Sequence, residues 1–342
     1  MTLPGRSFVA FSYKLTMSLL ITFLIIMPFA LASDTGTGSN NDEFHFSIPV
    51  TVWKNDNNNY KGIIIAIHGL TMHSGSYAVM AQNLSNLGYL VVAPDLRGFG
   101  QWMDTHTLNS QLQSVDYEAS YEDIARVITF VQEKYPNKPT FILGESLGAD
   151  FALRIASSQQ FKLQGMILSA PAIVSKAPVV ASVVLSELPR VIMNPKHEVN
   201  VKPFLAKYIS CDESIIESTI NDPYVRKNLT VADLLSTLKT LASSLSYAKK
   251  ISPDLPVLIL QGTKDALVNP KGVDKLVQTL KTKDSTVKIF KGEGHLLLET
   301  SQAKPKTLLA LNNWVKNHTT SNSPEQMATL TFLDKTLINN KN

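Results

Sequence analysis

The sequence is poor in several features that would point to particular classes of protein. Its 342 residues include one cysteine, Cys211, so no disulfide can form within the chain and the core alone must hold the fold. The net charge is +4 and the basic residues are scattered, which argues against a nucleic-acid partner. The motifs G-x-G-x-x-G, G-x-x-x-x-G-K-[ST] and H-E-x-x-H are all missing, and no group of metal ligands stands out. We therefore expect neither a cofactor nor a metal.

The chain is rich in apolar residues. Hydrophobic residues make up 44% of it and charged residues 18%, which is typical of a folded globular protein. At the N-terminus, Arg6 and Lys14 precede an apolar run from Leu15 to Leu31 that ends in an A-x-A pattern at Ala32. This order predicts a signal peptide over residues 1–32 and an exported protein, secreted or periplasmic. An uncleaved membrane anchor is the alternative, although the run is short for a spanning helix.

From residue 62 onward, short apolar runs alternate with amphipathic segments. The predicted strands are Gly62–Ile67, Tyr89–Ala93, Thr140–Leu143, Gly165–Ser169, Pro256–Gln261 and Thr286–Phe290. Because these runs are almost entirely apolar, they fit parallel strands that are covered on both faces. The predicted helices are Tyr77–Leu87, Ala119–Lys134, Leu147–Ser158, Lys271–Thr282 and Lys304–Asn317. The alternation predicts an α/β fold with a mostly parallel central sheet and helices on both faces, preceded by a hairpin at about residues 44–53.

The alternation of strands and helices breaks between residues 172 and 251. An insertion at the carboxyl edge of a parallel sheet lies over any site formed there, so we expect a mostly helical lid. Its apolar stretch, Ala177–Leu185, lines an acyl pocket or packs against the main domain, and the sequence leaves both open. The predicted organisation is one domain over residues 44–318 that contains the lid, followed by a C-terminal tail at 319–342.

The segment Gly144–Gly148 reads G-x-S-x-G and lies between a predicted strand and a predicted helix. In that context the turn forces Ser146 into a strained conformation, and the two glycines let strand and helix approach closely. The serine hydroxyl is lifted above the sheet edge at a helix N-terminus, which favours developing negative charge. Ser146 is therefore the predicted nucleophile. The alternative is an idle serine in a glycine-rich turn.

A nucleophilic serine needs a base, and the base needs a group that orients it. In an open α/β sheet both come from loops that follow later strands. Asp265 follows the fifth predicted strand and His295 follows the sixth. We predict that His295 takes the proton from Ser146 and that Asp265 holds the imidazole. Asp274 and Glu293 are weaker candidates for the orienting group.

Two backbone N–H groups are needed to stabilise the oxyanion that such a reaction forms. Leu147 directly follows the nucleophile and supplies one of them in this interpretation. The loop after the first predicted strand supplies the other, which we assign to Leu70. His68, at the start of that loop, is expected to tie the loop down through ring hydrogen bonds.

Several further short motifs accompany these residues along the chain. They are His68-Gly69, His73-Ser74-Gly75-Ser76-Tyr77, Ala93–Gly100, Asn221-Asp222-Pro223, Gln261–Asp265 and Gly292–His295. With the elbow at Gly144–Gly148, they resemble the monoacylglycerol lipase-like branch of the α/β-hydrolase superfamily, the serine aminopeptidase S33 or Hydrolase-4 type. The resemblance spans about residues 62–317, and the chain order Ser146, Asp265, His295 is that of the superfamily.

The resemblance implies an α/β-hydrolase fold with an inserted helical lid, a Ser146/Asp265/His295 triad and oxyanion donors at Leu70 and Leu147. It implies a serine hydrolase that cleaves carboxylic esters of lipids, of the monoacylglycerol lipase or lysophospholipase type. The implied partner is a small acyl ester or lipid, with transient contact of the lid with a membrane surface.

One departure from the family pattern and several alternatives accompany this expectation. Glu145 stands where many lipases of the branch have histidine, which leaves substrate choice open. A general carboxylesterase, an aminopeptidase-type amidase and an acyltransferase are alternatives on the same fold. A non-enzymatic binding module is a further alternative, but such modules usually lose the nucleophile or the histidine, and this chain has both.

Overall fold

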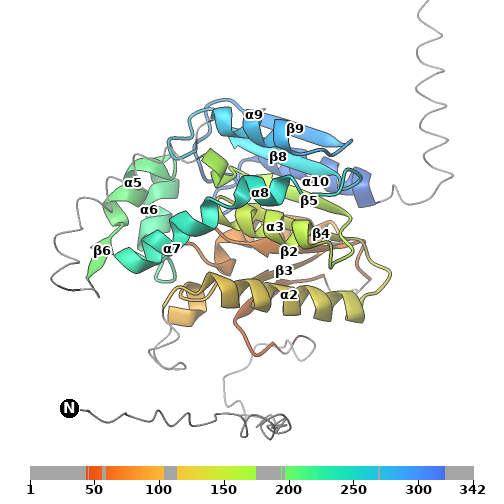
Figure 1. Cartoon of the computed structure of the whole chain (residues 1–342), viewed down its shortest axis with the longest axis horizontal. Coiled ribbons are helices and arrows are strands. Elements are labelled where there is room, and N and C mark those ends of the chain that lie inside the picture. The colour runs from red at the N-terminus through yellow and green to blue at the C-terminus, as the bar shows by residue number, and fades with distance from the viewer. Residues whose placement is uncertain are drawn as a thin grey trace, which may run out of the picture. The chain divides into compact units, whose positions relative to one another are not determined.

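The computed structural model describes residues 44, 46–55, 59–103, 114–174, 194, 197–268 and 270–319 (Figure 1). The predicted signal peptide at 1–32 and the predicted tail beyond residue 319 lie outside the described residues, as does the apolar stretch at 177–185. The elements below belong to one unit that begins at Phe46. Among the described residues, no helix is both long enough and apolar enough to cross a membrane.

A seven-stranded sheet in the order β1-β3-β2-β4-β5-β8-β9 forms the centre of this unit (Figure 1). Strand β1 is antiparallel to β3, and all other neighbouring strands are parallel. The prediction of a mostly parallel sheet is therefore confirmed. The strands are β1 (Val50–Trp53), β2 (Ile63–Ile67), β3 (Leu90–Pro94), β4 (Thr140–Glu145), β5 (Gly165–Ser169), β8 (Val257–Gly262) and β9 (Ser285–Phe290).

Burial along the strands follows their position in the sheet. Every residue of β2, β3, β4, β5 and β8 is buried, as expected where helices cover both faces of parallel strands. Strand β9 forms one edge and is mostly exposed. The hairpin expected at 44–53 is not present: within the described residues there, the chain forms the single strand β1, which pairs with β3.

Helices pack on the two faces of the sheet, as predicted. Helices α1 (Ala78–Asn86) and α10 (Pro305–Thr319) share one core cluster with the strands, through Met80, Leu84, Leu311 and Trp314. Helices α2 (Tyr117–Lys134) and α3 (Leu147–Ser158) lie together on the other face, with α8 (Ser244–Ala248) beside α3 and α9 (Pro270–Thr279) beside α8 (Figure 1).

The chain between β5 and β8 leaves the sheet, and its described part is mostly helical. It contains η4 (Ala172–Val174), β6 (Glu198–Asn200), α5 (Lys202–Tyr208), α6 (Glu213–Asn221), β7 (Asn228–Thr230), α7 (Val231–Leu241) and α8. We call residues 172–251 the insertion. Figure 1 shows α5, α6 and β6 gathered beside one end of the sheet. Strands β6 and β7 form an antiparallel ribbon that the sequence analysis missed, because each has three residues and only one of them buried.

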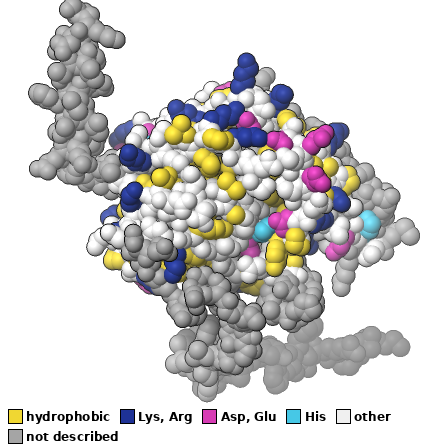
Figure 2. Space-filling view, turned by 180° about the vertical axis from the view of Figure 1, so that it is seen from behind, with side chains coloured by type: hydrophobic (Ala, Val, Ile, Leu, Met, Phe, Trp, Pro, Cys, Tyr) yellow, Lys and Arg dark blue, Asp and Glu magenta, His cyan; other side chains and the backbone are white. Residues whose placement is uncertain are grey.

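Charged side chains of both signs are distributed over the face shown in Figure 2. Hydrophobic side chains lie between them. One surface ion pair within the described residues joins Lys283 to Asp254 at 2.7 Å, and pairs of this exposed kind contribute little to stability. The fold is therefore held mainly by its buried sheet.

Candidate active site

Ser146 occupies the sharp turn between β4 and α3, with φ 55° and ψ −116°. A positive φ is unfavourable for a residue that carries a Cβ, so this conformation is strained. The two flanking glycines permit the turn. A Cβ on Gly144 would lie 2.1 Å from the carbonyl oxygen of Gly148, and one on Gly148 would lie 1.9 Å from that of Ile67. The strand–turn–helix arrangement predicted from the sequence is present.

His295 and Asp265 come together from the loops that follow β9 and β8. The Nδ1 atom of His295 lies 2.8 Å from Oδ2 of Asp265, and both side chains are buried. Asp265 also accepts hydrogen bonds from the backbone of Val268 and from Nε2 of Gln261, both at 2.9 Å. These donors fix the carboxylate, which in turn orients the imidazole and leaves its Nε2 facing away from Asp265.

The two weaker candidates for the orienting group lie elsewhere. Glu293 pairs with Lys306 at 2.7 Å, and Asp274 is exposed on α9. Within the part of the chain that the structure describes, neither carboxylate forms a hydrogen bond with His295, whereas Asp265, the preferred candidate, forms one.

The electrostatics of the His295–Asp265 pair favour a charged imidazole. Burial alone lowers the pKa of His295, but the negative charge and hydrogen bond of Asp265 outweigh it, so the pKa is raised. Burial alone raises the pKa of Asp265, but the interaction with His295 and the hydrogen bonds from Val268 and Gln261 outweigh it, so that pKa is lowered. A histidine held in this way accepts a proton more readily than a free imidazole.

Ser146 and His295 line one cavity of about 240 Å³, together with Leu70 and Leu147. Most of the remaining wall is apolar and comes from the insertion, including Val201, Phe204, Leu205, Leu229, Leu234 and Leu241. The structure therefore brings the predicted nucleophile, base and oxyanion residues to one cavity, whose remaining lining is mostly apolar and could contact an acyl chain.

The backbone amides of Leu70 and Leu147 are oriented by their surroundings. Leu147 is the first residue of α3, so its N–H has no acceptor within the helix. The N–H of Leu70 shares a peptide unit with the carbonyl of Gly69, and that carbonyl accepts from Nδ1 of His68 at 2.8 Å. Because a trans peptide points its C=O and N–H in opposite directions, this bond turns the Leu70 N–H away from His68. Within the described residues, neither amide has a partner in the protein.

His68 is a structural residue, as predicted. Its Nε2 accepts from the backbone N–H of Leu96 at 2.9 Å, so the network assigns the proton to Nδ1, which donates to Gly69. Burial lowers the pKa of His68 to about 4, so the ring is neutral at pH 7.

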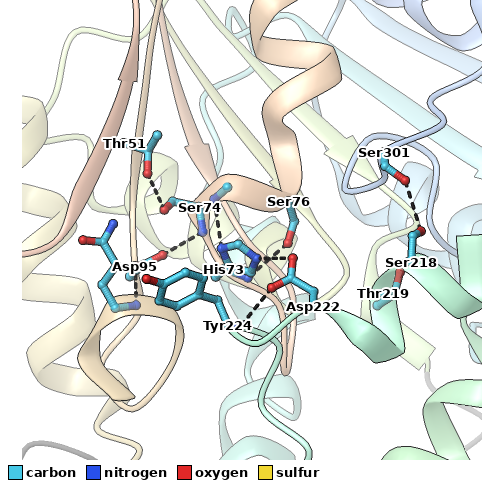
Figure 3. Close-up of polar contacts among 12 residues, drawn as sticks. Thr51, His73, Ser74, Ser76, Asp95, Ser218, Thr219, Asp222, Tyr224 and Ser301 are labelled. Carbon is cyan, nitrogen blue, oxygen red and sulfur yellow. Dashed lines mark hydrogen bonds and ion pairs between the residues drawn. The ribbon is translucent and has the colours of Figure 1, made fainter. Parts of the chain in front are cut away.

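A second contact joins this loop to the insertion (Figure 3). His73 Nε2 lies 3.0 Å from Oδ2 of Asp222, and Oδ1 of Asp222 accepts from the backbone of Tyr224 at 2.8 Å. On the other side, the N–H of Ser74 donates to Asp95 at 2.7 Å. Two motifs noted in the sequence, His73–Tyr77 and Asn221–Pro223, therefore meet in space, and their contact holds the insertion beside the loop that carries Leu70.

Glu145, whose role the sequence left open, does not line the cavity. It is fully buried, and its carboxylate accepts from the backbone N–H groups of Leu297, Leu298 and Glu299 at 2.7, 3.0 and 2.6 Å. Ser169 donates a further bond at 2.9 Å. Glu145 therefore fastens the nucleophile strand to the segment after His295. Glu299, by contrast, lines the cavity, and no sequence motif identified it.

Comparisons with known proteins agree with this geometry. A family model described as "Serine aminopeptidase, S33" matches residues 58–302. Human monoglyceride lipase is 27% identical over 263 residues, covering 76% of this chain and 84% of that protein. Phospholipase YtpA of Bacillus subtilis is 26% identical over 236 residues, covering 68% and 87%. A solved structure of a soluble variant of monoglyceride lipase from Saccharomyces cerevisiae, in complex with a substrate analog, has a TM-score of 0.67 at 22% identity and covers 80% and 92%. The chain is thus a lipase- and esterase-like α/β hydrolase and belongs to the serine aminopeptidase S33 (Hydrolase_4) family.

Proposed function

We propose that the protein is a serine hydrolase that cleaves carboxylic esters of lipids, of the monoacylglycerol lipase or lysophospholipase type. The observation that carries the proposal is the buried Asp265–His295 hydrogen bond on the wall of the cavity that also holds the strained Ser146. The apolar wall from the insertion supports an acyl substrate, and the relatives named above support lipid esters.

In the proposed reaction, Oγ of Ser146 attacks the ester carbonyl carbon while Nε2 of His295 takes the hydroxyl proton. The tetrahedral oxyanion accepts hydrogen bonds from the N–H groups of Leu70 and Leu147. The bond to the leaving alcohol then breaks, and that alcohol takes the proton from His295. Water, giving its proton to His295, attacks the acyl-enzyme; the carboxylic acid leaves and the proton returns to Ser146.

The charge of the cavity wall favours an ester over a peptide with a free N-terminus. An aminopeptidase needs a negative group to hold the substrate ammonium. Among the described residues that line the cavity, the acidic side chain is Glu299, and burial together with the charge of Glu145 raises its pKa well above the ordinary value. A carboxyl group whose pKa is raised in this way holds its proton more tightly than an ordinary glutamate and attracts an ammonium ion less, so the wall is better suited to an uncharged acyl chain.

The test compares hydrolysis of a long-chain monoacylglycerol, a lysophosphatidylcholine, p-nitrophenyl butyrate and an aminoacyl p-nitroanilide by the protein and by Ser146→Ala. We expect cleavage of the two lipids, with a loss on the order of a millionfold in kcat in the variant. Cleavage of only the short ester would reduce the assignment to a general carboxylesterase. Cleavage of only the anilide, or no labelling of Ser146 by a fluorophosphonate, would contradict the proposal.

We also propose that residues 1–32 direct export and are removed, and that the insertion contacts membrane surfaces. The N-terminal charge and apolar pattern support the first proposal. Exposed apolar side chains of the insertion, Leu235 and Tyr224, support the second. The N-terminal peptide of the exported protein, determined by mass spectrometry, should begin at Ser33. Sedimentation with lipid vesicles should weaken when Leu235 is replaced by Ser.

A further inference from the structure

A buried carboxyl group lies beside the predicted oxyanion loop without a complete set of partners. Glu299 is 0% exposed and lines the same cavity as Ser146. Its Oε1 accepts from the backbone N–H of Gly69 at 2.7 Å. Its Oε2 is buried and has no hydrogen-bond partner among the described residues. A Cβ on Gly69 would lie 2.9 Å from Oε2 and 3.2 Å from the Cβ of Ser146, so these groups are in close proximity.

Two hydrogen bonds to Gly69 restrain the backbone that leads to the N–H of Leu70. Glu299 accepts from the N–H of Gly69, and His68 donates to its carbonyl oxygen. The two bonds hold the backbone on both sides of the Gly69 Cα. Glycine rotates more freely than any other residue, so a loop with glycine at this point needs both restraints to keep one orientation. Loss of the Glu299 bond would remove one of these two restraints, so the Leu70 N–H would keep its orientation toward the cavity less well.

On the basis of the proposed function, we infer that Glu299 is a positioning residue of the oxyanion hole and acts as a neutral carboxylic acid. It holds the His68–Gly69 peptide through Oε1, which restrains rotation at Gly69 and so helps to position the Leu70 N–H. It also keeps negative charge away from the place where the oxyanion forms. A carboxylate at that position would repel the oxyanion in a water-poor cavity, where charges interact strongly. Catalysis therefore requires both the proton on the Glu299 carboxyl group and its hydrogen bond with the N–H of Gly69.

The groups that face Glu299 keep the proton on it. Glu145 on β4 accepts four hydrogen bonds, from three backbone amides and Ser169, whereas Glu299 accepts one from Gly69. Burial raises the pKa of Glu145 as well, but its four hydrogen bonds and the nearby His295 oppose that rise. Of two interacting carboxyl groups, the one that accepts more hydrogen bonds holds the negative charge more readily, and the other holds the proton. Burial, followed by the charge of Glu145, raises the pKa of Glu299 well above its ordinary value.

The remaining neighbours do not reverse this assignment. The hydroxyl of Tyr77 donates to the carbonyl of Ile67 at 2.8 Å, and its proximity to Glu299 lowers the pKa of that carboxyl less than burial and Glu145 raise it. His295 lines the same cavity. Burial raises the pKa of Tyr77 too, so the phenol is also neutral. Because Oε1 must accept from Gly69, the proton of Glu299 resides on Oε2 and makes that atom a donor.

Two substitutions of Glu299 distinguish a role as a neutral hydrogen-bonding acid from a role that only fills space. Glu299→Gln keeps an acceptor for the Gly69 N–H and puts an uncharged donor where Oε2 lies. Glu299→Leu removes both. Asp150→Asn is the matched control: Asp150 is also buried, is hydrogen-bonded to Ser244, has a pKa that burial raises to about 7, and does not line the cavity.

The experiment measures kcat and KM for an ester substrate from pH 6 to pH 10, and inhibition by a trifluoromethyl ketone that forms a tetrahedral adduct with serine. We expect Glu299→Leu to lower kcat by about 10- to 100-fold, somewhat less than the loss of a whole oxyanion donor, with little change in KM. Inhibitor affinity should fall by a similar factor. Glu299→Gln should keep kcat within about threefold of the parent, because it retains the hydrogen bond.

The pH profile gives a readout that a structural role would not change. The active form of Glu299 is protonated, so the parent should lose activity as pH rises through its raised pKa. Glu299→Gln should lack that alkaline loss, and Asp150→Asn should keep it. Equal losses in the Gln and Leu variants, or an identical alkaline limb in the parent and Glu299→Gln, would overturn the inference.

Two further results keep this inference distinct from the proposed function. A parent that neither cleaves esters nor labels at Ser146 would refute the proposed function, and this inference with it. An active parent with a fully active Glu299→Leu variant would refute only the inference. If Glu299→Leu does not fold, the pH comparison of the parent with Glu299→Gln still decides between the outcomes.

Discussion

Replacing Ser146 by glycine should make the protein more stable while abolishing its activity. The serine has φ 55° and ψ −116°, a conformation that glycine adopts readily and other residues adopt only under strain. Strain of this kind costs about 1–3 kcal/mol. Glycine loses about 0.5–1 kcal/mol more backbone entropy on folding than alanine. Subtracting this entropy cost from the strain that is relieved leaves a net gain in folding stability of about 1 kcal/mol. The relief of backbone strain is the source of that gain.

The comparison that isolates this strain is Ser146→Gly against Ser146→Ala. Both variants lack the hydroxyl and should be inactive, but the alanine keeps the Cβ and so keeps the strain. Urea and thermal unfolding should show the glycine variant to be about 1 kcal/mol more stable, or about 2–4 °C higher in Tm for a domain of this size. A glycine variant equal to or less stable than the alanine variant would show that the turn stores no strain in Ser146.

Further predictions concern the residues around the nucleophile. Asp265→Asn should lower kcat by about 10⁴-fold, as loss of the triad aspartate does in related chemistry. Because Asp265 raises the pKa of His295 and the neutral imidazole is the base, the parent loses kcat/KM as pH falls through that raised pKa; in the variant this acid limb should move to lower pH. Gly148→Ala should destabilise the protein by about 3 kcal/mol or more in urea unfolding, because the new methyl group meets the backbone of Ile67. The neighbouring Ala149→Gly should cost only about 1 kcal/mol, and a similar loss in both variants would contradict the steric argument.

Much of the sheet and the elbow could be predicted because their signals are local. Strand Gly165–Ser169 and helix Leu147–Ser158 have the predicted bounds, since uninterrupted apolar runs and a glycine-flanked turn are each read within a few residues. The loops that carry Asp265 and His295 could be predicted because they follow two such runs. Parallel strands end at the same edge of a sheet, so their loops meet there whatever lies between them in the sequence.

The roles of the buried carboxyl groups of Glu145 and Glu299 could not be predicted from local patterns. Glu145 bonds to backbone groups 152 to 154 residues away, and Glu299 bonds to a backbone group 230 residues away. Backbone N–H groups carry no side-chain identity, so no residue pattern shows which amides a glutamate will meet. The sequence showed that Glu145 departs from a family pattern, but only the fold shows that it faces the segment after His295 instead of the cavity.

Several unfavourable features of the fold are concentrated around Ser146. The serine is strained. Among the described residues, neither Oε2 of Glu299 nor the amides of Leu70 and Leu147 have a hydrogen-bond partner. Each of these would weaken a fold that was optimised for stability alone, and in the proposed reaction each lies at or beside the groups that act on the tetrahedral oxyanion. The fully buried strands β2, β4 and β5 supply the stability that offsets them. Under the proposed function, this is the arrangement expected where binding energy is used to stabilise a transition state.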